Sequence, residues 1–331
     1  MRNRLVALTL ASVGVASSLL SPIPVAAASV TLDTVLVGDA GNAADPLTGY
    51  GAVAQEFRMG TYEVTIAQYV TFLNVVAKVP RNDVMAGLYK EEMADPKSEE
   101  DPGALIQRTG SGTKADPYRY SASTSAAWPN AAERPVAWVT WFDAARFANW
   151  MHNGQGKAGT ETGAYTLVDF QESGPLSRNL DAKFWIPSED EWVKAAYYDP
   201  TKLGSNKYWT FPTRTDKPPR FAQVADTPPA PAANFQNVYK GSDAGVLTPV
   251  GSYSGSSSHY GTFDQGGSLW EWTEAAYPSA TAGPNRIVRG GSWGPGITPL
   301  MKTVRRDYGP MVSEPFYYDD DAGFRIATTV S

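Results

Sequence analysis

The sequence predicts a domain of the α+β class, with short helices packed on a mixed sheet and much irregular structure. Gly and Pro contribute 30 and 25 of the 331 residues, which favours loops on a compact scaffold over long regular elements. Three short segments begin with helix-capping sequences. Two further segments, one towards each end of the chain, alternate apolar and polar residues as strands do.

Each of the three predicted helices begins at a hydroxyl residue. Thr65 and Gln68 form one capping box, Ser188 and Glu191 form another, and Thr140 starts the run TWFDAA. The apolar residues that recur at helical spacing are Tyr69, Phe72, Leu73 and Val76 in the first helix, Ala144, Phe147, Ala148 and Met151 in the second, and Trp192, Ala195 and Ala196 in the third. These patterns indicate short amphipathic helices that bury one face on a sheet.

The two terminal strands are expected to pair with each other. Residues 56–60 read EFRMG and residues 323–327 read GFRIA, so both alternate in the same way, and a pairing between them would close the domain. Residues 286–290 form a third candidate strand. The polar stretch 81–133 and the Pro-rich stretch 201–233 are predicted to be loop insertions.

The first 28 residues have the pattern of a secretory signal peptide. Arg2 and Arg4 precede a mostly apolar run that ends near Leu20, and three consecutive alanines at 26–28 offer a cleavage site. Residues 29–331 are then expected to form a single domain that is secreted or periplasmic. No later segment is apolar enough to predict a membrane span.

The composition excludes several kinds of chemistry. The formal net charge is −6 and no basic block occurs, which argues against nucleic-acid binding. Cysteine is absent, so the chain has no disulfide, no thiolate metal ligand and no thiol nucleophile. The only histidines are His152, expected at a helix end, and His259, expected in an exposed Ser-rich loop. A facial triad for non-haem iron, which needs two histidines and a carboxylate, is therefore not expected.

The stretch GGSLWEW, residues 266–272, places an acidic residue between two tryptophans. In a simple strand Trp270 and Trp272 would share one face and Glu271 would lie on the other. Alternatively Glu271 faces inward, and a buried carboxylate requires a cation or an arginine beside it. The residues alone leave both interpretations open.

Six blocks of the chain, in order, resemble the formylglycine-generating enzyme, or sulfatase-modifying factor, family. They are FRMGTYEVT (57–65), the segment from RPV to WFDAA (134–145), FWIPSEDEW (184–192), the segment 261–272, RGGSW (289–293) and GFR (323–325). The resemblance covers the chain from about Phe57 to Ala327. It implies a variant of the C-type-lectin-like fold, a twisted mixed sheet with short helices and much irregular structure.

The resemblance also implies structural calcium. In the family the block that ends in WEW wraps one calcium ion, which places Glu271 among the ligands and Ser268 where the family usually has Asn. Because a Ser hydroxyl is a poorer calcium ligand than an amide oxygen, Arg289 or Arg325 is an alternative partner for Glu271. A second family site corresponds to Asn234, Phe235, Asp243 and Gly245.

The family's active site does not carry over. Formylglycine-generating enzymes bind copper through two Cys after the RGGS block, where this chain reads WGPGITPL, so no copper is expected. The family's substrate groove beside that block would correspond here to Ser292, Trp293, Arg305, Arg306, Tyr308 and Glu314.

Three functions follow from these observations. The first is an exported, calcium-stabilised binding module for a peptide, a glycan or a surface partner, without formylglycine-generating activity. The second is an oxidoreductase of the wider family, of the non-haem metal or siderophore-maturation type, with an unrecognised site near Arg305, Arg306, Asp307 and Glu314. The third is a calcium-stabilised structural component of an envelope assembly.

Overall fold

The computed structural model describes residues 29–82, 85, 87–94, 105–124, 129–156, 159–167, 176–221, 231–235, 247–276, 286–293, 307–308 and 320–330. The helices are α1 (Ile66–Val76), α3 (Trp141–His152) and α4 (Glu189–Tyr197), with 3-10 turns η1 (Glu91–Met93) and η2 (Ala131–Glu133). The strands are β1 (Thr34–Val37), β2 (Phe57–Gly60), β3 (Ile106–Thr109), β4 (Arg119–Ala122), β5 (Phe184–Trp185), β6 (Arg220–Phe221), β7 (Ala232–Ala233), β8 (Trp270–Ala276), β9 (Arg286–Arg289), β10 (Asp307–Tyr308), β11 (Ala322–Gly323) and β12 (Ala327–Thr328). The predicted α+β class is confirmed.

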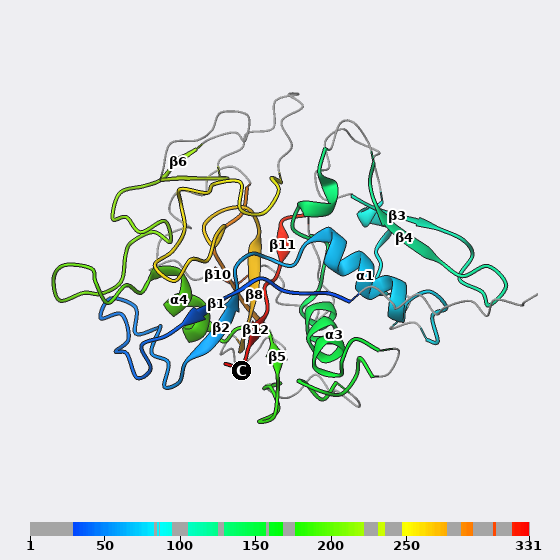
Figure 1. Cartoon of the computed structure of the whole chain (residues 1–331), viewed down its shortest axis with the longest axis horizontal. Helices are drawn as coiled ribbons and strands as arrows, with labels where there is room; N and C mark the ends of the chain where they lie inside the picture. The colour runs from blue at the N-terminus through cyan, green and yellow to red at the C-terminus, as the bar shows by residue number, and fades with distance from the viewer. Residues whose placement is uncertain are drawn as a thin grey trace, which may run out of the picture.

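The central strands separate two groups of elements. In Figure 1, α1, α3 and the β3–β4 hairpin lie on one side of these strands, and α4 with the long loop after it lies on the other. The C-terminus lies beside β12 and β5 at the lower edge of this view. The described chain is thus built around short strands near its middle, with little regular structure at its periphery.

All three predicted helices are present and each has the expected cap. The hydroxyl of Thr65 accepts the backbone N–H of Gln68, that of Thr140 accepts the N–H of Asp143, and that of Ser188 accepts the N–H of Glu191. In each case the third residue of the helix returns a bond from its side chain to the cap backbone. These reciprocal bonds satisfy N–H groups that a helix cannot satisfy internally, so they fix where each helix begins.

The predicted pairing of the two terminal segments is confirmed. One four-stranded sheet has the order β1-β2-β12-β5, and Ala327 on β12 lies opposite Met59 on β2 and Trp185 on β5. The prediction of one continuous strand over 323–327 is wrong. The segment is divided into β11 and β12, because Phe324 to Ile326 leave one sheet and enter the other.

The second four-stranded sheet has the order β10-β9-β8-β11. Strand β9 confirms the third candidate strand and runs antiparallel to β8, with Glu271 opposite Arg289. Strand β11 runs parallel to β8 and pairs Gly323 with Glu271. The C-terminal segment therefore contributes one short strand to each sheet and joins them.

The stretch 81–133 is not simply a loop. Strands β3 and β4 form an antiparallel hairpin inside it. The Arg108 guanidinium lies 4.4 Å from the ring centre of Tyr89 and 4.6 Å from that of Tyr118. The hydroxyl of Tyr120 donates to the backbone oxygen of Ala77 at the end of α1. The prediction of a loop was wrong because it rested on polar composition, whereas the charged side chain of Arg108 packs against aromatic rings.

The main core joins α1, α3 and the C-terminal segment through aromatic rings. Phe72 and Phe147 meet edge to face at 5.4 Å between ring centres, and Phe147 meets Phe324 in the same way at 5.5 Å. Trp150 packs against both Phe72 and Phe147. Aromatic pairs in these geometries add to the hydrophobic contribution of burial.

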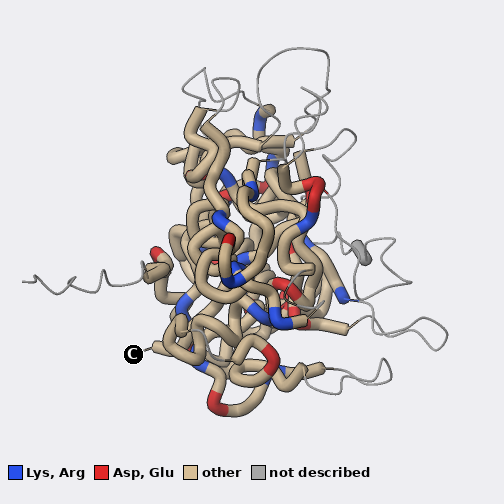
Figure 2. Tube along the Cα trace, turned by 90° about the vertical axis from the view of Figure 1, so that its right-hand side faces the viewer, with Lys and Arg blue, Asp and Glu red and all other residues tan. Residues whose placement is uncertain are grey.

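Charged residues are mixed along the described chain. Lys and Arg alternate with Asp and Glu on the trace in Figure 2 and do not gather into one block. Within the described residues, no helix combines the length and the apolar character needed to cross a membrane.

The capping boxes lead to a stability prediction. Thr65→Ala removes the hydroxyl that accepts the Gln68 N–H, so it should lower the free energy of unfolding by about 1 kcal/mol in urea denaturation. Thr71→Ala is the matched control, since Thr71 lies within α1 and bonds only the backbone oxygen of Ala67 one turn earlier. Alanine favours the helix interior, so Thr71→Ala should be neutral or stabilising. Equal losses in both variants would contradict the role of the cap.

Candidate functional site

Glu271 faces the interior and is paired with Arg325. Both side chains are fully buried. The Arg325 Nε donates to Glu271 Oε2 at 2.5 Å and its Nη2 donates to Oε1 at 2.7 Å, while the indole N–H of Trp192 donates to Oε2 at 2.8 Å. Of the two interpretations of GGSLWEW, the inward-facing carboxylate is correct, and its partner is an arginine.

A second ion pair lies beside the first. The Arg289 Nε and Nη2 donate to Glu189 Oε1 at 3.0 and 2.7 Å, which ties β9 to the first turn of α4. The Arg289 guanidinium also lies 5.3 Å from the ring centre of Tyr50. Although Glu271 and Arg289 are opposite each other in the sheet, each forms its ion pair with a residue from elsewhere in the chain.

More carboxylates surround Arg325 than its single charge can balance. Glu63 is buried, and neither of its carboxylate oxygens has a hydrogen-bond partner among the described residues. Burial raises the pKa of Glu63 well above its usual range, and the neighbouring Asp264 and Glu271 raise it further. Burial also raises the pKa of Asp264 to about 6, although its carboxylate accepts the Gly251 N–H at 2.7 Å. The structure therefore favours the neutral form of Glu63.

The predicted calcium residues near Asn234 form a tight backbone contact. The Ser268 N–H donates to the backbone oxygen of Asn234 at 2.8 Å, and Ser268 has a φ of 61°. A Cβ on Gly267 would lie 2.1 Å from that same oxygen, so glycine is required before Ser268. Asn234, Phe235 and Ser268 are all buried. Asp243 and Gly245 lie outside the described residues.

The structure fits one of the two expected calcium sites better than the other. Both oxygens of Glu271 are already bonded to Arg325 and Trp192, so this carboxylate serves as the counter-ion of an arginine and does not fit a calcium ligand. Asn234 and Phe235 are brought together with the turn before β8, which is compatible with a site that includes backbone oxygens.

Two of the predicted groove residues have side chains that the structure describes. Ser292 is buried and its hydroxyl donates to Asp321 Oδ2 at 2.7 Å. Trp293 is partly exposed, and its backbone N–H donates to the oxygen of Ser268. Arg305, Arg306 and Glu314 lie outside the described residues, and of Tyr308 only the backbone is described, in β10 opposite Ile287.

Sequence reasoning missed Trp138. This partly exposed residue has a φ of 62°, in the left-handed region that bulky side chains rarely adopt. Trp138 and Trp293 both pack against the small apolar cluster of Ala137, Leu247 and Leu269. The indole nitrogen of Trp293 is buried without an acceptor among the described residues. No sequence pattern marks a left-handed tryptophan.

The comparisons identify the family. The model of the sulfatase-modifying factor enzyme 1-like domain matches residues 30–330. The chain belongs to this family.

Two curated relatives match part of the domain, and both are named hercynine oxygenase. The protein from Mycolicibacterium smegmatis is 31% identical over 133 residues, which cover 34% of this chain and 27% of that protein. The protein from Mycolicibacterium thermoresistibile is 27% identical over 164 residues, covering 44% of this chain and 32% of that protein. This sulfatase-modifying factor domain thus matches only about a third or less of the length of these relatives.

Two solved structures share the fold of this sulfatase-modifying factor domain. CarF aligns with a TM-score of 0.55 and 20% identity over 91% of this chain and 99% of its own. Treponema denticola variable protein 1 aligns with a TM-score of 0.51 and 16% identity over 92% and 98%. The fold is C-type-lectin-like, as the resemblance implied. Identities this low bear on the fold alone.

The histidines of this sulfatase-modifying factor domain are bound to separate elements. The His152 Nδ1 accepts the Lys183 N–H at 3.1 Å, and the His259 Nδ1 lies 3.0 Å from Asp199 Oδ1. Burial alone would raise the pKa of Asp199, but hydrogen bonds from Thr201 and Trp209 outweigh it and lower the pKa to about 2. Among the described residues, no three His, Asp or Glu side chains are placed so that they could hold a metal ion.

The acids around Arg325 lead to a pH-dependent prediction. The pKa of Glu63 is higher in the folded state than in the unfolded chain, so its stabilising contribution is complete below the unfolded pKa of about 4.3 and is lost as the pH rises. Glu63→Gln keeps the shape and removes the ionisation. It should therefore raise the free energy of unfolding at pH 7 to 8 by at least about 1 kcal/mol, and by much less at pH 4.5.

Urea denaturation at several pH values measures this effect. Glu133→Gln, at an exposed position, is the control and should follow the wild type at every pH. The two proteins could instead differ in free energy of unfolding by the same amount from pH 4.5 to 8. That result would show that the pKa of Glu63 is the same in the folded and unfolded states.

Proposed function

We propose that this sulfatase-modifying factor domain is an exported binding module that recognises a peptide or a glycan through the surface around Trp138 and Trp293. It does not generate formylglycine, because the chain contains no cysteine to bind copper. The observation that carries the proposal is that two partly exposed tryptophans pack on the same small apolar cluster. The signal-like first 28 residues support export.

The tryptophan surface has two properties of a ligand site. A left-handed backbone at a bulky residue such as Trp138 costs of order 1–3 kcal/mol, and such strain is concentrated at binding and catalytic sites. Partly exposed indoles also offer large rigid faces at a small cost in conformational entropy. A ligand oxygen that accepted the N–H of Trp293 would offset the cost of burying that donor without a partner.

The oxidoreductase alternative rests on the hercynine oxygenase relatives. Their similarity covers at most 44% of this chain, and the two histidines of this chain are held on separate elements. Metal analysis of the purified protein, together with oxygen consumption in the presence of hercynine, tests this alternative directly. Stoichiometric iron together with hercynine-dependent oxygen uptake would contradict the binding module and support an oxidoreductase.

Substitution at Trp293 tests the binding surface. A ligand is first selected from a random heptapeptide library and a panel of soluble oligosaccharides, and its affinity is measured by calorimetry. Trp293→Ala should weaken binding at least tenfold, because truncation of a tryptophan in a binding site commonly costs more than about 1 kcal/mol. The melting temperature should change little, since Trp293 is only partly buried.

The control for this experiment is Trp209→Ala. Trp209 is also partly exposed, and its indole donates to Asp199 Oδ2 at 3.0 Å in a different part of the domain. Equal loss of affinity in Trp293→Ala and Trp209→Ala, or an unchanged affinity in Trp293→Ala, would place the binding surface elsewhere.

We also propose that calcium stabilises the turn at Asn234. Its buried side chain and the Phe235 backbone would contribute ligands next to the turn before β8. If calcium binds the folded state only, dialysis against EDTA should lower the melting temperature by several degrees, and calcium should restore it better than magnesium. Asn234→Ala should melt at the same temperature with and without EDTA. An unchanged wild-type melting temperature after chelation would contradict a structural ion.

A further inference from the structure

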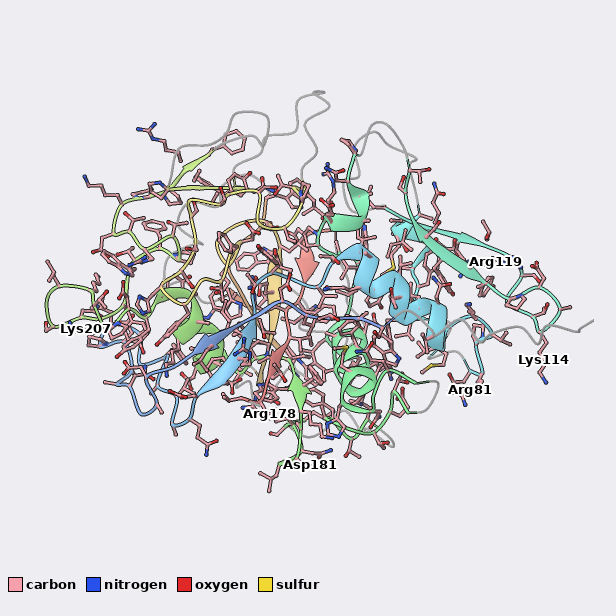
Figure 3. All side chains as sticks on the ribbon, in the orientation of Figure 1. Arg81, Lys114, Arg119, Arg178, Asp181 and Lys207 are labelled. Atoms are coloured by element: carbon pink, nitrogen blue, oxygen red, sulfur yellow. The ribbon has the colours of Figure 1, made fainter. Side chains whose placement is uncertain are left out.

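A groove distinct from the tryptophan surface lies at the edge formed by β5 and β12. Its volume is about 690 Å³, which is within the usual range for ligand sites. Its walls come from three regions: residues 53–57 before and at the start of β2, the 177–182 loop, and the C-terminal residues 329–330. Side chains from β5, α4 and β8 also line it. Figure 3 shows Arg178 and Asp181 at this lower edge of the molecule.

The single arginine that lines the groove is already neutralised. Arg178 donates from Nη1 and Nη2 to the two carboxylate oxygens of Glu191, at 3.0 and 2.7 Å. Its guanidinium lies 4.5 Å from the ring centre of Trp185, whose indole N–H donates to the same carboxylate. Because Arg178 is held between an acid and an aromatic ring, it offers little attraction for an anionic ligand.

A second carboxylate leaves the groove with a negative charge. Glu274 accepts the backbone N–H of Arg178 at 2.9 Å and lies 3.8 Å from its Nε. Burial raises the pKa of Glu274, so a nearby positive charge would favour its ionised form. Glu56 also lines the groove, but its carboxylate lies towards Gly38. Glu191 and Glu274 therefore place two acids beside one arginine.

The rim of the groove is apolar. Leu180 is fully exposed and Val330 is 47% exposed, and both line the groove with Val53. A single exposed leucine needs no explanation, but here three apolar side chains surround an acidic hollow. Such a rim would contact apolar groups on either side of a bound cation.

We propose that this groove binds the basic side chain of a peptide, arginine or lysine, with apolar residues on either side of it. The ammonium or guanidinium would lie beside Glu274, and the flanking apolar side chains would contact Leu180 and Val330. Glu274 lies six residues after Ser268, which contacts Trp293. An extended chain of this length spans about 20 Å, so the groove is separate from the tryptophan surface. The proposal does not depend on that surface.

Calorimetry with the full chain tests the groove. The probe is the capped peptide acetyl-Leu-Arg-Leu-amide, and the matched neutral probe replaces Arg by Gln. The Arg peptide should bind measurably and the Gln peptide at least tenfold more weakly. Glu274→Gln should weaken the Arg peptide about tenfold, as expected for loss of a partly buried charged partner. Glu56→Gln should leave its affinity nearly unchanged, because the Glu56 carboxylate lies towards Gly38.

Asp181→Asn provides the matched control. Asp181 is an exposed acid next to Leu180 that does not line the groove, so its removal should leave the affinity nearly unchanged. Equal effects of Glu274→Gln and Asp181→Asn would overturn the site, as would equal binding of the Arg and Gln peptides or no binding of either. If free n-butylguanidinium binds as tightly as the Arg peptide, the assignment of a peptide is wrong. Trp293→Ala should bind the Arg peptide like the wild type, which separates this test from that of the tryptophan surface.

Discussion

The arrangement of the two large sheets depends on the buried ion pair between Arg325 and Glu271. Arg325 holds Glu271 of β8 through two hydrogen bonds and also donates to the backbone oxygens of Gly60 and Phe263. These contacts explain why the C-terminal segment is divided between β11 and β12. Arg325 must point into the space between the sheets, so the residues around it cannot continue either ladder. Removing one member of a buried pair typically costs 3–5 kcal/mol, because the other charge is left without a partner.

The same arginine sets the charge balance of the interior. Its single positive charge is matched by Glu271, so Glu63 and Asp264 remain as excess acids. Burial is the main cause of their raised pKa values, and the charge of Glu271 raises both further. A cation beside Glu271 would compete with Arg325 for the same two oxygens. Arg325 thus serves as the counter-ion of Glu271, at the position where the resemblance implied a calcium ligand.

The sequence predicted those parts of the structure that depend on local chemistry. Capping residues such as Thr65 fix a helix start within four residues, so the helices could be located from the sequence alone. The partner of Glu271 could not be chosen between Arg289 and Arg325, because the choice depends on where α4 brings Glu189. For the candidate site, Ser292 and Trp293 followed from the family blocks, whereas the left-handed backbone of Trp138 is imposed by tertiary contacts that no spacing encodes.

Strand β8 connects the interior to both proposed surfaces. The turn at Ser268 just before it positions Trp293, Glu271 within it anchors Arg325, and Glu274 further along it lines the acidic groove. The Glu271–Arg325 pair and the Glu274–Arg178 contact are formed by residues outside the stretch WGPGITPL, which begins at Trp293. A strand held by buried ion pairs is also a rigid base for binding sites, because side chains on such elements are positioned more accurately than those on loops.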